Sequence, residues 1–285
     1  MAQSLNSWHV SQDARDDEAA DILLRDPIWN SFALADLEHP LRNYSQFPMA
    51  WLEGSSERAI CLILRHPIIG EVISPSGSEE GIAAILKQID LPEHPLLQVQ
   101  KRHFPLLQHY YRPETNWRSM FRMAIPPSSQ QALIQTFTPS SPVRQLGMAD
   151  LPALKRFYDL YSENPFSTDL FARALFFGVY DGQELIAAGG TRVLSQTYHL
   201  AVLGYVLTAP QARRQGFATA ITASLVAKLS AQGFSTIALN VFADNSPAIR
   251  IYQRLGFQSH HRLSTSKGIL VLPLDAPTPS CYNGQ

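Results

Sequence analysis

The chain has 285 residues, of which 45% are hydrophobic, 16% charged and 10% aromatic. This length suits two domains of ordinary size, and the composition is that of a globular protein rather than a disordered one. The 23 lysine and arginine residues nearly cancel the 24 aspartate and glutamate residues, which excludes a protein that holds nucleic acid or an anionic membrane surface by its net charge.

The first half of the chain alternates between strand and helix patterns. Helices are expected at residues 18–24, 29–37, 81–89 and 104–111, and strands at 50–52, 59–64, 72–73, 96–99 and 119–125. Such alternation predicts an α/β domain. The Pro- and Ser-rich stretch from Pro126 to Pro142 then reads as a linker, which places the domain boundary near Pro139.

The second half repeats this rough order without a repeat at the level of residues. Strands are expected at 143–146, 176–180, 185–193, 198–207, 236–241, 260–263 and 269–272, and helices at 151–161, 216–231 and 247–255. Asp150 is expected to cap the first of these helices. Residues 275–285 are rich in Pro, Ser, Asn and Gly, which predicts a flexible tail. The predicted domains are therefore 1–138 and 139–274.

The cysteines and the N-terminus bear on location. Cys61 and Cys281 lie far apart, so they form neither a CxxC motif nor a disulfide framework, and a reducing compartment is the simpler interpretation. Residues 1–20 lack the basic start and apolar stretch of a signal peptide, and no segment approaches the ~20 apolar residues of a membrane helix. These features predict a cytoplasmic protein.

The segment 203–219 runs from a strand through a loop into a helix that begins close to Gly216, because apolar residues recur at helical spacing from there on. The first turn of a helix has unpaired N–H groups and a positive dipole, and Gly216 and Ala218 leave its backbone open to an anion. Arg213 and Arg214 add positive charge. The segment therefore predicts an anion site, although the string R-x-x-G-x-A by itself is more often an ordinary helix start.

A second informative segment spans residues 238–257. Ser246 is expected as the N-cap of a short helix that Gly256 terminates. Tyr252 shares one face of this helix with apolar residues, so its side chain points toward the sheet. Taken alone, such a tyrosine is more often a core aromatic than a catalytic group.

Together the two segments resemble the GNAT superfamily of N-acyltransferases. The family's loop pattern R/Q-x-x-G-x-G/A is matched by Arg213, Gly216 and Ala218. Its pattern N-x-x-A-x-x-x-Y-x-x-x-G-F is matched by Asn245, Ala248, Tyr252, Gly256 and Phe257. The resemblance covers about residues 143–272 and implies an α+β fold, a mixed and largely antiparallel sheet flanked by helices.

The N-terminal domain is expected to be a second, degenerate GNAT-like domain. Its nearest counterpart of the loop, residues 74–81, has carboxylates in place of the arginines, so we expect no cofactor there.

The resemblance implies acetyl-CoA as the donor. The cofactor-binding residues that it implies are Val206, Leu207, Thr208, Arg213, Arg214, Gln215, Gly216, Phe217, Ala218, Thr219, Asn240, Asn245, Ala248 and Tyr252. The strand at 206–208 would hold the pantetheine arm in a gap beside Asn240, the loop would wrap the pyrophosphate, and Asn245 would orient the cofactor. Tyr252 would protonate the thiolate of CoA.

The general base is not evident. His199 is the single titratable candidate of suitable pKa on the strand before the loop, although a histidine there is more often a surface residue. The alternative, equally supported, is that water accepts the proton of the amine and carries it out of the site. Because neither cysteine lies near the motifs, direct attack in a ternary complex is favoured over a covalent acyl-enzyme.

The expected acceptor is a primary amine of a small molecule or peptide, entering over residues 161–168, and the expected protein is a monomer or homodimer without a metal. A catalytically inactive CoA-binding regulatory module is the alternative from another class. Transfer to oxygen, or of acyl groups longer than acetyl, is a further alternative.

Overall fold

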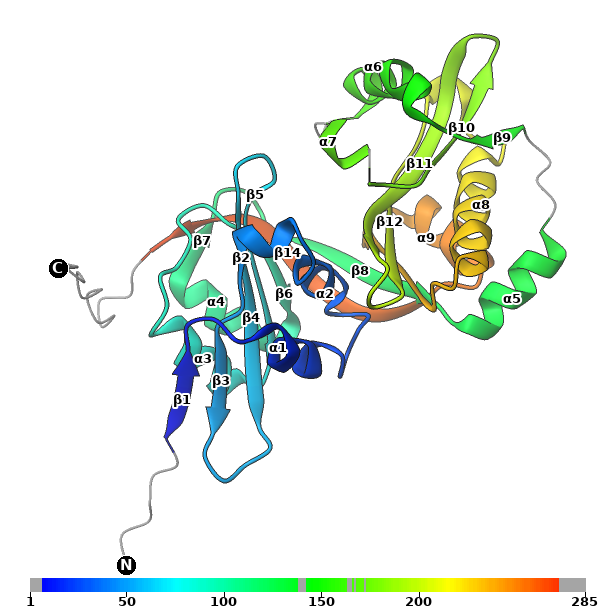
Figure 1. Cartoon of the computed structure of the whole chain (residues 1–285). Helices are drawn as coiled ribbons and strands as arrows, with labels where there is room; N and C mark the ends of the chain where they lie inside the picture. The colour runs from blue at the N-terminus through cyan, green and yellow to red at the C-terminus, as the bar shows by residue number, and fades with distance from the viewer. Residues whose placement is uncertain (1–6, 138–141, 163–165, 167, 172, 272–285) are drawn as a thin grey trace, which may run out of the picture. The chain divides into compact units, whose positions relative to one another are not determined.

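The computed structural model describes residues 7–137, 142–162, 166, 168–171 and 173–271 (Figure 1). The chain forms two compact units. Unit 1 takes the residues up to Met120 together with those from Arg262 onward, and unit 2 is Phe121–His261. The boundaries fall inside two strands, β8 (Arg118–Ile125) and β14 (Gln258–Leu270). The predicted tail, 275–285, lies outside the described residues.

Unit 1 has one sheet with helices packed on it. Its further elements are β1 (Trp8–Ser11), α1 (Asp16–Leu23), α2 (Ser31–Asp36), β2 (Ser45–Gln46), β3 (Met49–Leu52), β4 (Arg58–His66), β5 (Gly70–Gly77), α3 (Glu79–Leu86), β6 (Leu96–Gln100), α4 (Phe104–Tyr110) and β7 (Tyr111–Pro113). The strand order is β1-β3-β4-β5-β6-β14. Neighbours are antiparallel except β5 and β6, which are parallel. Apolar side chains of α3 and α4 bury one face of this sheet.

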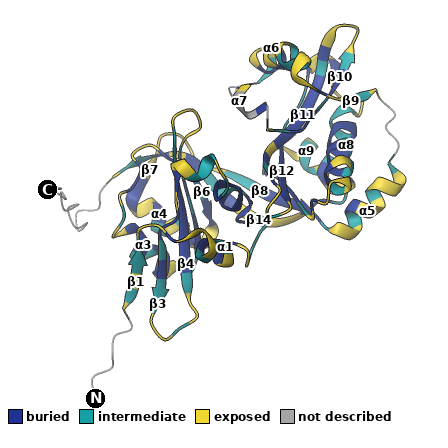
Figure 2. Ribbon diagram, viewed as in Figure 1, coloured by how far each residue is buried: buried dark blue, intermediate teal, exposed yellow. Residues whose placement is uncertain are grey.

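Unit 2 has the same kind of sheet between two layers of helices. Its further elements are α5 (Pro127–Thr136), β9 (Val143–Gln145), α6 (Leu151–Tyr161), α7 (Thr168–Phe171), β10 (Phe176–Asp181), β11 (Glu184–Ser195), β12 (Leu200–Thr208), α8 (Phe217–Ala231), β13 (Thr236–Phe242) and α9 (Ser246–Arg254). The strand order is β8-β13-β12-β11-β10-β9, and β12 and β13 form the parallel pair. Figure 1 shows α8 on one face and α6 and α7 on the other, and Figure 2 shows buried residues along β11 and β12 between them.

The two units repeat one order of elements: antiparallel strands, a helix that joins a parallel strand pair, and a further helix. In unit 1 this order is β5-α3-β6-α4, and in unit 2 it is β12-α8-β13-α9. Beside the second strand of each pair lies a strand from the other half of the sequence, β14 beside β6 and β8 beside β13. The prediction of a mixed, largely antiparallel sheet in each of two domains is confirmed.

The compact units do not divide at the predicted boundary near Pro139. β8 lies before that boundary but belongs mostly to unit 2, and β14 returns the chain to unit 1. Composition marks where a chain turns, but hydrogen bonding along a strand edge decides to which sheet the strand belongs.

Three local expectations differ from the structure. The Pro-rich stretch contains the helix α5, since Pro127 occupies the first turn, where its missing N–H costs nothing. The two final strands are one long strand, β14. Asp150 precedes α6 without capping it, because its carboxylate instead accepts bonds from Arg144, Tyr180 and the backbone of Gly147.

Candidate functional site

A bulge in β12 shapes the site. Ala188 pairs with Leu207 and Gly190 pairs with Gly204, so two residues of β12 lie opposite one residue of β11. Tyr205, one of the two, has a φ of 58°, and its carbonyl oxygen accepts a hydrogen bond from the buried Tyr158 hydroxyl. Such a bulge bends its strand and interrupts regular pairing.

The parallel ladder between β12 and β13 ends at this level. Pairing runs from Leu200 and Thr236 to Leu203 and Leu239. Beyond the bulge, Val206–Thr208 still lie beside β11 but line a pocket of about 750 Å³. The edge of this short segment that would pair with β13 is therefore open to a cavity.

The pocket extends from β12 to the first turns of α8 and α9. Its lining residues are Val206, Leu207, Thr208, Ala212, Arg213, Arg214, Gly216, Phe217, Ala218, Thr219, Asn245, Pro247, Ala248, Arg250, Ile251, Tyr252 and Arg254. The structure thus brings together most of the residues that the two sequence segments singled out.

The N-terminus of α8 is open. Its N-cap, Gly216, has a φ of 86° and no side chain to cap the helix, and a Cβ built on it would meet no atom within 4 Å. Arg214 also has a positive φ, 64°. By contrast, α3 and α9 are capped by side chains. The free N–H groups of the first turn of α8 and its dipole therefore face a cavity that suits an anion.

Four arginines line the pocket, which gives it a strong positive potential. Arg213 and Arg214 come from the loop before α8, and Arg250 and Arg254 come from α9. The sequence patterns missed the second pair. Their spacing of four residues on the face of α9 opposite the apolar one was the signal that could have found them.

The N-cap of α9 is Asn245 and not Ser246. Its Oδ1 accepts a hydrogen bond of 3.2 Å from the backbone N–H of Ala248. An asparagine side chain can replace the missing carbonyl partner of that N–H, so Asn245 shapes the pocket by starting the helix.

Tyr252 points inward as its helical position predicts. Only 8% of it is exposed, it packs with core residues of α8 and α9, and it also lines the pocket. Burial raises the pKa of its phenol from 10.0 to about 12, because an ion is costly in an apolar environment. The hydroxyl is therefore a proton donor at every physiological pH.

Three of the predicted site residues do not line the pocket. Gln215 is exposed in the loop. The Oδ1 of Asn240 accepts a hydrogen bond of 2.9 Å from Nε of the buried Arg122. His199 is exposed just before β12 begins, where its carbonyl oxygen accepts bonds from the backbone of Ser235 and Thr236. The pocket lies at the other end of β12, so the structure does not bring His199 to it.

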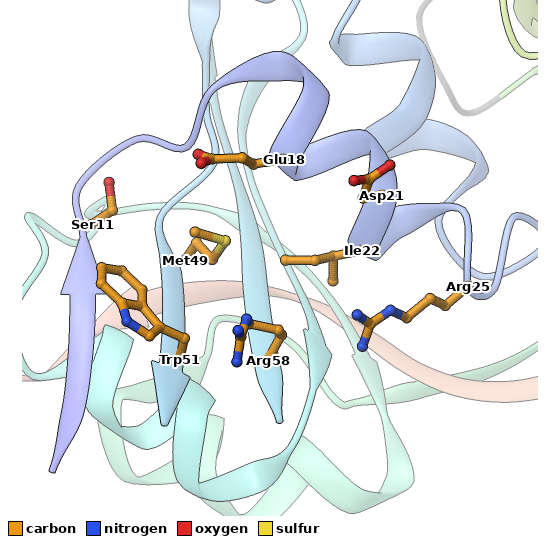
Figure 3. A pocket seen from close by; sticks show the side chains of 8 residues that line it. All are labelled: Ser11, Glu18, Asp21, Ile22, Arg25, Met49, Trp51 and Arg58. Carbon is orange, nitrogen blue, oxygen red and sulfur yellow. The ribbon is translucent and has the colours of Figure 1, made fainter. Parts of the chain in front are cut away.

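Unit 1 lacks the loop that builds this pocket. Residues 209–216 connect β12 to α8, whereas Ser78 alone connects β5 to α3. The Ser78 hydroxyl caps α3, and Glu79 and Glu80 occupy its first turn, which disfavours an anion there. Instead, unit 1 has a groove of about 430 Å³ between α1 and the strands (Figure 3). Its lining mixes two carboxylates, two guanidinium groups and apolar side chains.

Comparisons with known proteins agree with this geometry. Residues 142–257 match the family model described as "Acetyltransferase (GNAT) family". Residues 142–257 are therefore a GNAT domain. The resemblance seen in the sequence motifs is confirmed, and the domain belongs to a family of acetyltransferases.

Relatives of known sequence match less than half of the chain. The uncharacterized N-acetyltransferase YoaA of Bacillus subtilis is 28% identical over 138 residues, which cover 45% of this chain and 73% of that protein. The ribosomal protein bS18 alanine N-acetyltransferase of Escherichia coli is 31% identical over 97 residues, which cover 34% of this chain and 64% of that protein.

Solved structures match both units. A Drosophila protein has a TM-score of 0.66 at 15% identity and covers 92% of this chain and 98% of its own. A tandem GNAT protein from the clavulanic acid biosynthesis pathway has a TM-score of 0.54 at 10% identity and covers 92% of this chain and 98% of its own. At these identities the likeness concerns the fold alone, and it agrees with a second GNAT-like domain in unit 1.

Among the described residues, none of the helices combines the length and apolar character that a bilayer crossing requires.

Proposed function

We propose that this protein is an acetyl-CoA-dependent N-acetyltransferase, which transfers the acetyl group to a primary amine of a small molecule or peptide in a ternary complex. The observation that carries the proposal is one continuous pocket. It joins the segment of β12 that has no pairing with β13 to the uncapped, arginine-flanked start of α8.

The shape and charge of the pocket support acetyl-CoA as the donor. The pantetheine arm carries amides that can pair with the backbone of Val206–Thr208 as an added strand would. The diphosphate suits the free N–H groups at residues 217–219 together with Arg213 and Arg214. Because Gly216 has no side chain, the phosphate oxygens can approach this backbone closely.

The chemistry needs a polarised thioester, a neutral amine and a stabilised thiolate leaving group. A backbone N–H beside the bulge of β12 is suited to the thioester oxygen. The Tyr252 hydroxyl is suited to the sulfur. Burial raises the pKa of the phenol, so the hydroxyl stays protonated and can donate to the departing thiolate. The same burial raises the pKa of the thiolate, which favours Tyr252 as the group that protonates it.

The amine loses its proton to water in this scheme. The residues that line the pocket include no aspartate, glutamate or histidine, and His199 lies at the far end of β12. The same observation favours the alternative, a CoA-binding regulatory module without turnover.

The acceptor class agrees with what the relatives are named for. One relative acetylates an alanine of ribosomal protein bS18, which is a peptide amine. A cytoplasmic location is part of this proposal, since acetyl-CoA is an intracellular donor.

Two measurements on the full chain test the proposal. Calorimetry with acetyl-CoA should show one site, and a screen of small amines and peptides should give CoA release with an N-acetyl product identified by mass. Binding of acetyl-CoA with CoA release at the background rate would favour the regulatory module. An absence of binding to any CoA thioester would refute both.

A further inference from the structure

An arginine crosses β12 next to the bulge. A Cβ built on Gly204 would lie 2.5 Å from Cγ and 2.7 Å from Cδ of Arg192, so the Arg192 side chain runs from β11 directly over Gly204. Its guanidinium carbon lies 5.3 Å from the ring centroid of Tyr205, which is the bulge residue. Only a glycine at position 204 leaves room for this path.

This arginine lies on the face of the sheet opposite α8 and α9. Leu203 and Leu239 pack in the core with α8 and α9, and successive side chains of a strand alternate between faces. Gly204 and Asn240 therefore face the other side, where Arg192 crosses. Leu203 and Leu239 are also the last pair of the parallel ladder, so the crossing occurs where β12 and β13 cease to pair.

Arg192 has an aromatic contact but no acidic partner. It is exposed, and within the described ranges no carboxylate forms an ion pair with it. The neighbouring rings of Tyr158, Phe166 and Phe176 pack around Tyr205. The cation–π contact holds the guanidinium beside the bulge, with its donors available to an anion.

With the donor in the pocket on the side of α8 and α9, as the proposed function has it, the face that carries Arg192 is left for the approach of the amine. We propose that Arg192 binds a carboxylate of the acceptor, which makes the preferred acceptor an amino acid or a peptide with its carboxylate a few bonds from the amine. This inference rests on the proposed transferase function. The amine nitrogen bonds to the thioester carbon, the C–S bond breaks with its electron pair on sulfur, and the amine proton leaves to water. Arg192 is unchanged throughout.

The test compares acceptors in which an amide replaces the carboxylate, with each rate divided by the fraction of the amine that is neutral at the pH of the assay. The full chain is assayed with acetyl-CoA and matched pairs: glycine and glycinamide, alanine and alaninamide, and a dipeptide and its amide. Wild-type protein should have the higher kcat/KM for the acid of each pair. Arg192→Met should lower kcat/KM for the acids by about 10-fold or more and for the amides by less than about 3-fold. Arg192→Lys should retain part of the preference, because it keeps the charge without the bidentate geometry.

Two controls separate this inference from the function on which it rests. Arg156→Met removes an exposed arginine of α6 and should change neither member of a pair. Acetyl-CoA affinity should be the same in all variants. Acetylation of acids and amides at equal rates, or an equal loss for both in Arg192→Met, would overturn the role of Arg192 while leaving the transferase intact.

A binding experiment covers the case without turnover. Calorimetry on CoA-saturated protein should show tighter binding of N-acetylglycine than of N-acetylglycinamide, with the difference abolished in Arg192→Met. Equal affinities, or no binding of either product, would overturn the inference without any reference to rates.

Discussion

The replacement of Gly216 by alanine separates a structural role of this residue from a role in binding. Gly216 has a φ of 86°, where a residue with a Cβ loses roughly 1–2 kcal/mol. The lower conformational entropy of unfolded alanine offsets part of this cost. Because a Cβ at this position meets no protein atom within 4 Å, no clash adds to it. Gly216→Ala should therefore lower the free energy of unfolding by only about 1 kcal/mol.

The effect on the donor should be larger. The new methyl group would stand beside the N–H groups of α8 at the pocket wall. Hydrogen bonds to a charged group contribute about 1.5–3 kcal/mol each, so the loss of one such bond to the diphosphate should weaken acetyl-CoA binding about 10- to 100-fold. Calorimetry gives the affinity, and urea denaturation gives the stability.

Gly233 provides the matched control for this variant. It has the same φ of 86° and an equally open Cβ position, but it follows the far end of α8 and does not line the pocket. Gly233→Ala should therefore cost a similar stability and leave acetyl-CoA binding unchanged. Equal affinities of the two variants would show that the diphosphate does not lie at the start of α8.

Three further predictions concern charge, the tyrosine and pH. Arg214→Glu should weaken acetyl-CoA binding about 10-fold or more, and this effect should become smaller at high salt. Lys228→Glu, near the other end of α8, should leave acetyl-CoA binding unchanged. Equal losses of affinity in both variants would show that the overall charge of the protein, and not a contact with Arg214, attracts acetyl-CoA. Tyr252→Phe should lower kcat roughly 10- to 100-fold with little change in acetyl-CoA affinity, and an unchanged kcat would remove its hydroxyl from the reaction. Burial raises the pKa of Asp36 from 3.8 to about 7. As the pH rises, the carboxyl loses its proton in the unfolded chain before it does so in the folded protein, so the free energy of unfolding falls between about pH 4 and pH 7. Asp36→Asn should therefore stabilise the fold by up to about 4 kcal/mol at pH 8 and by little at pH 3.5. Urea denaturation at both pH values measures this difference, and an equal gain at both would show that the stabilisation comes from packing and not from the charge.

The sequence predicted the parts of the site that depend on local structure. Gly216 and the arginines before it mark an open helix start, and the spacing in α9 turns Tyr252 inward. These features follow from helix geometry within a few residues. The cap of α9 was misplaced by one residue, from Asn245 to Ser246, because both side chains can accept the same hydrogen bond and only the backbone geometry distinguishes them.

The strand edges could not be predicted in this way. His199 and Val206 belong to one stretch of extended sequence, and no local pattern shows that β12 loses its pairing with β13 from the bulge at Tyr205 onward. Likewise, β8 reads as the last strand of the first half, although its hydrogen bonds are with β13 in the second.

By itself, the sequence determined the class of fold, the family of the second half and the loop that would hold a diphosphate, because each depends on residue types at fixed short spacing. Only the tertiary structure decided which strands share a sheet, that Ser78 replaces the whole loop in unit 1, and that Arg192 crosses Gly204 beside the bulge. These depend on contacts between residues far apart in the chain, where the packing of one strand against another selects among pairings that the local sequence permits equally.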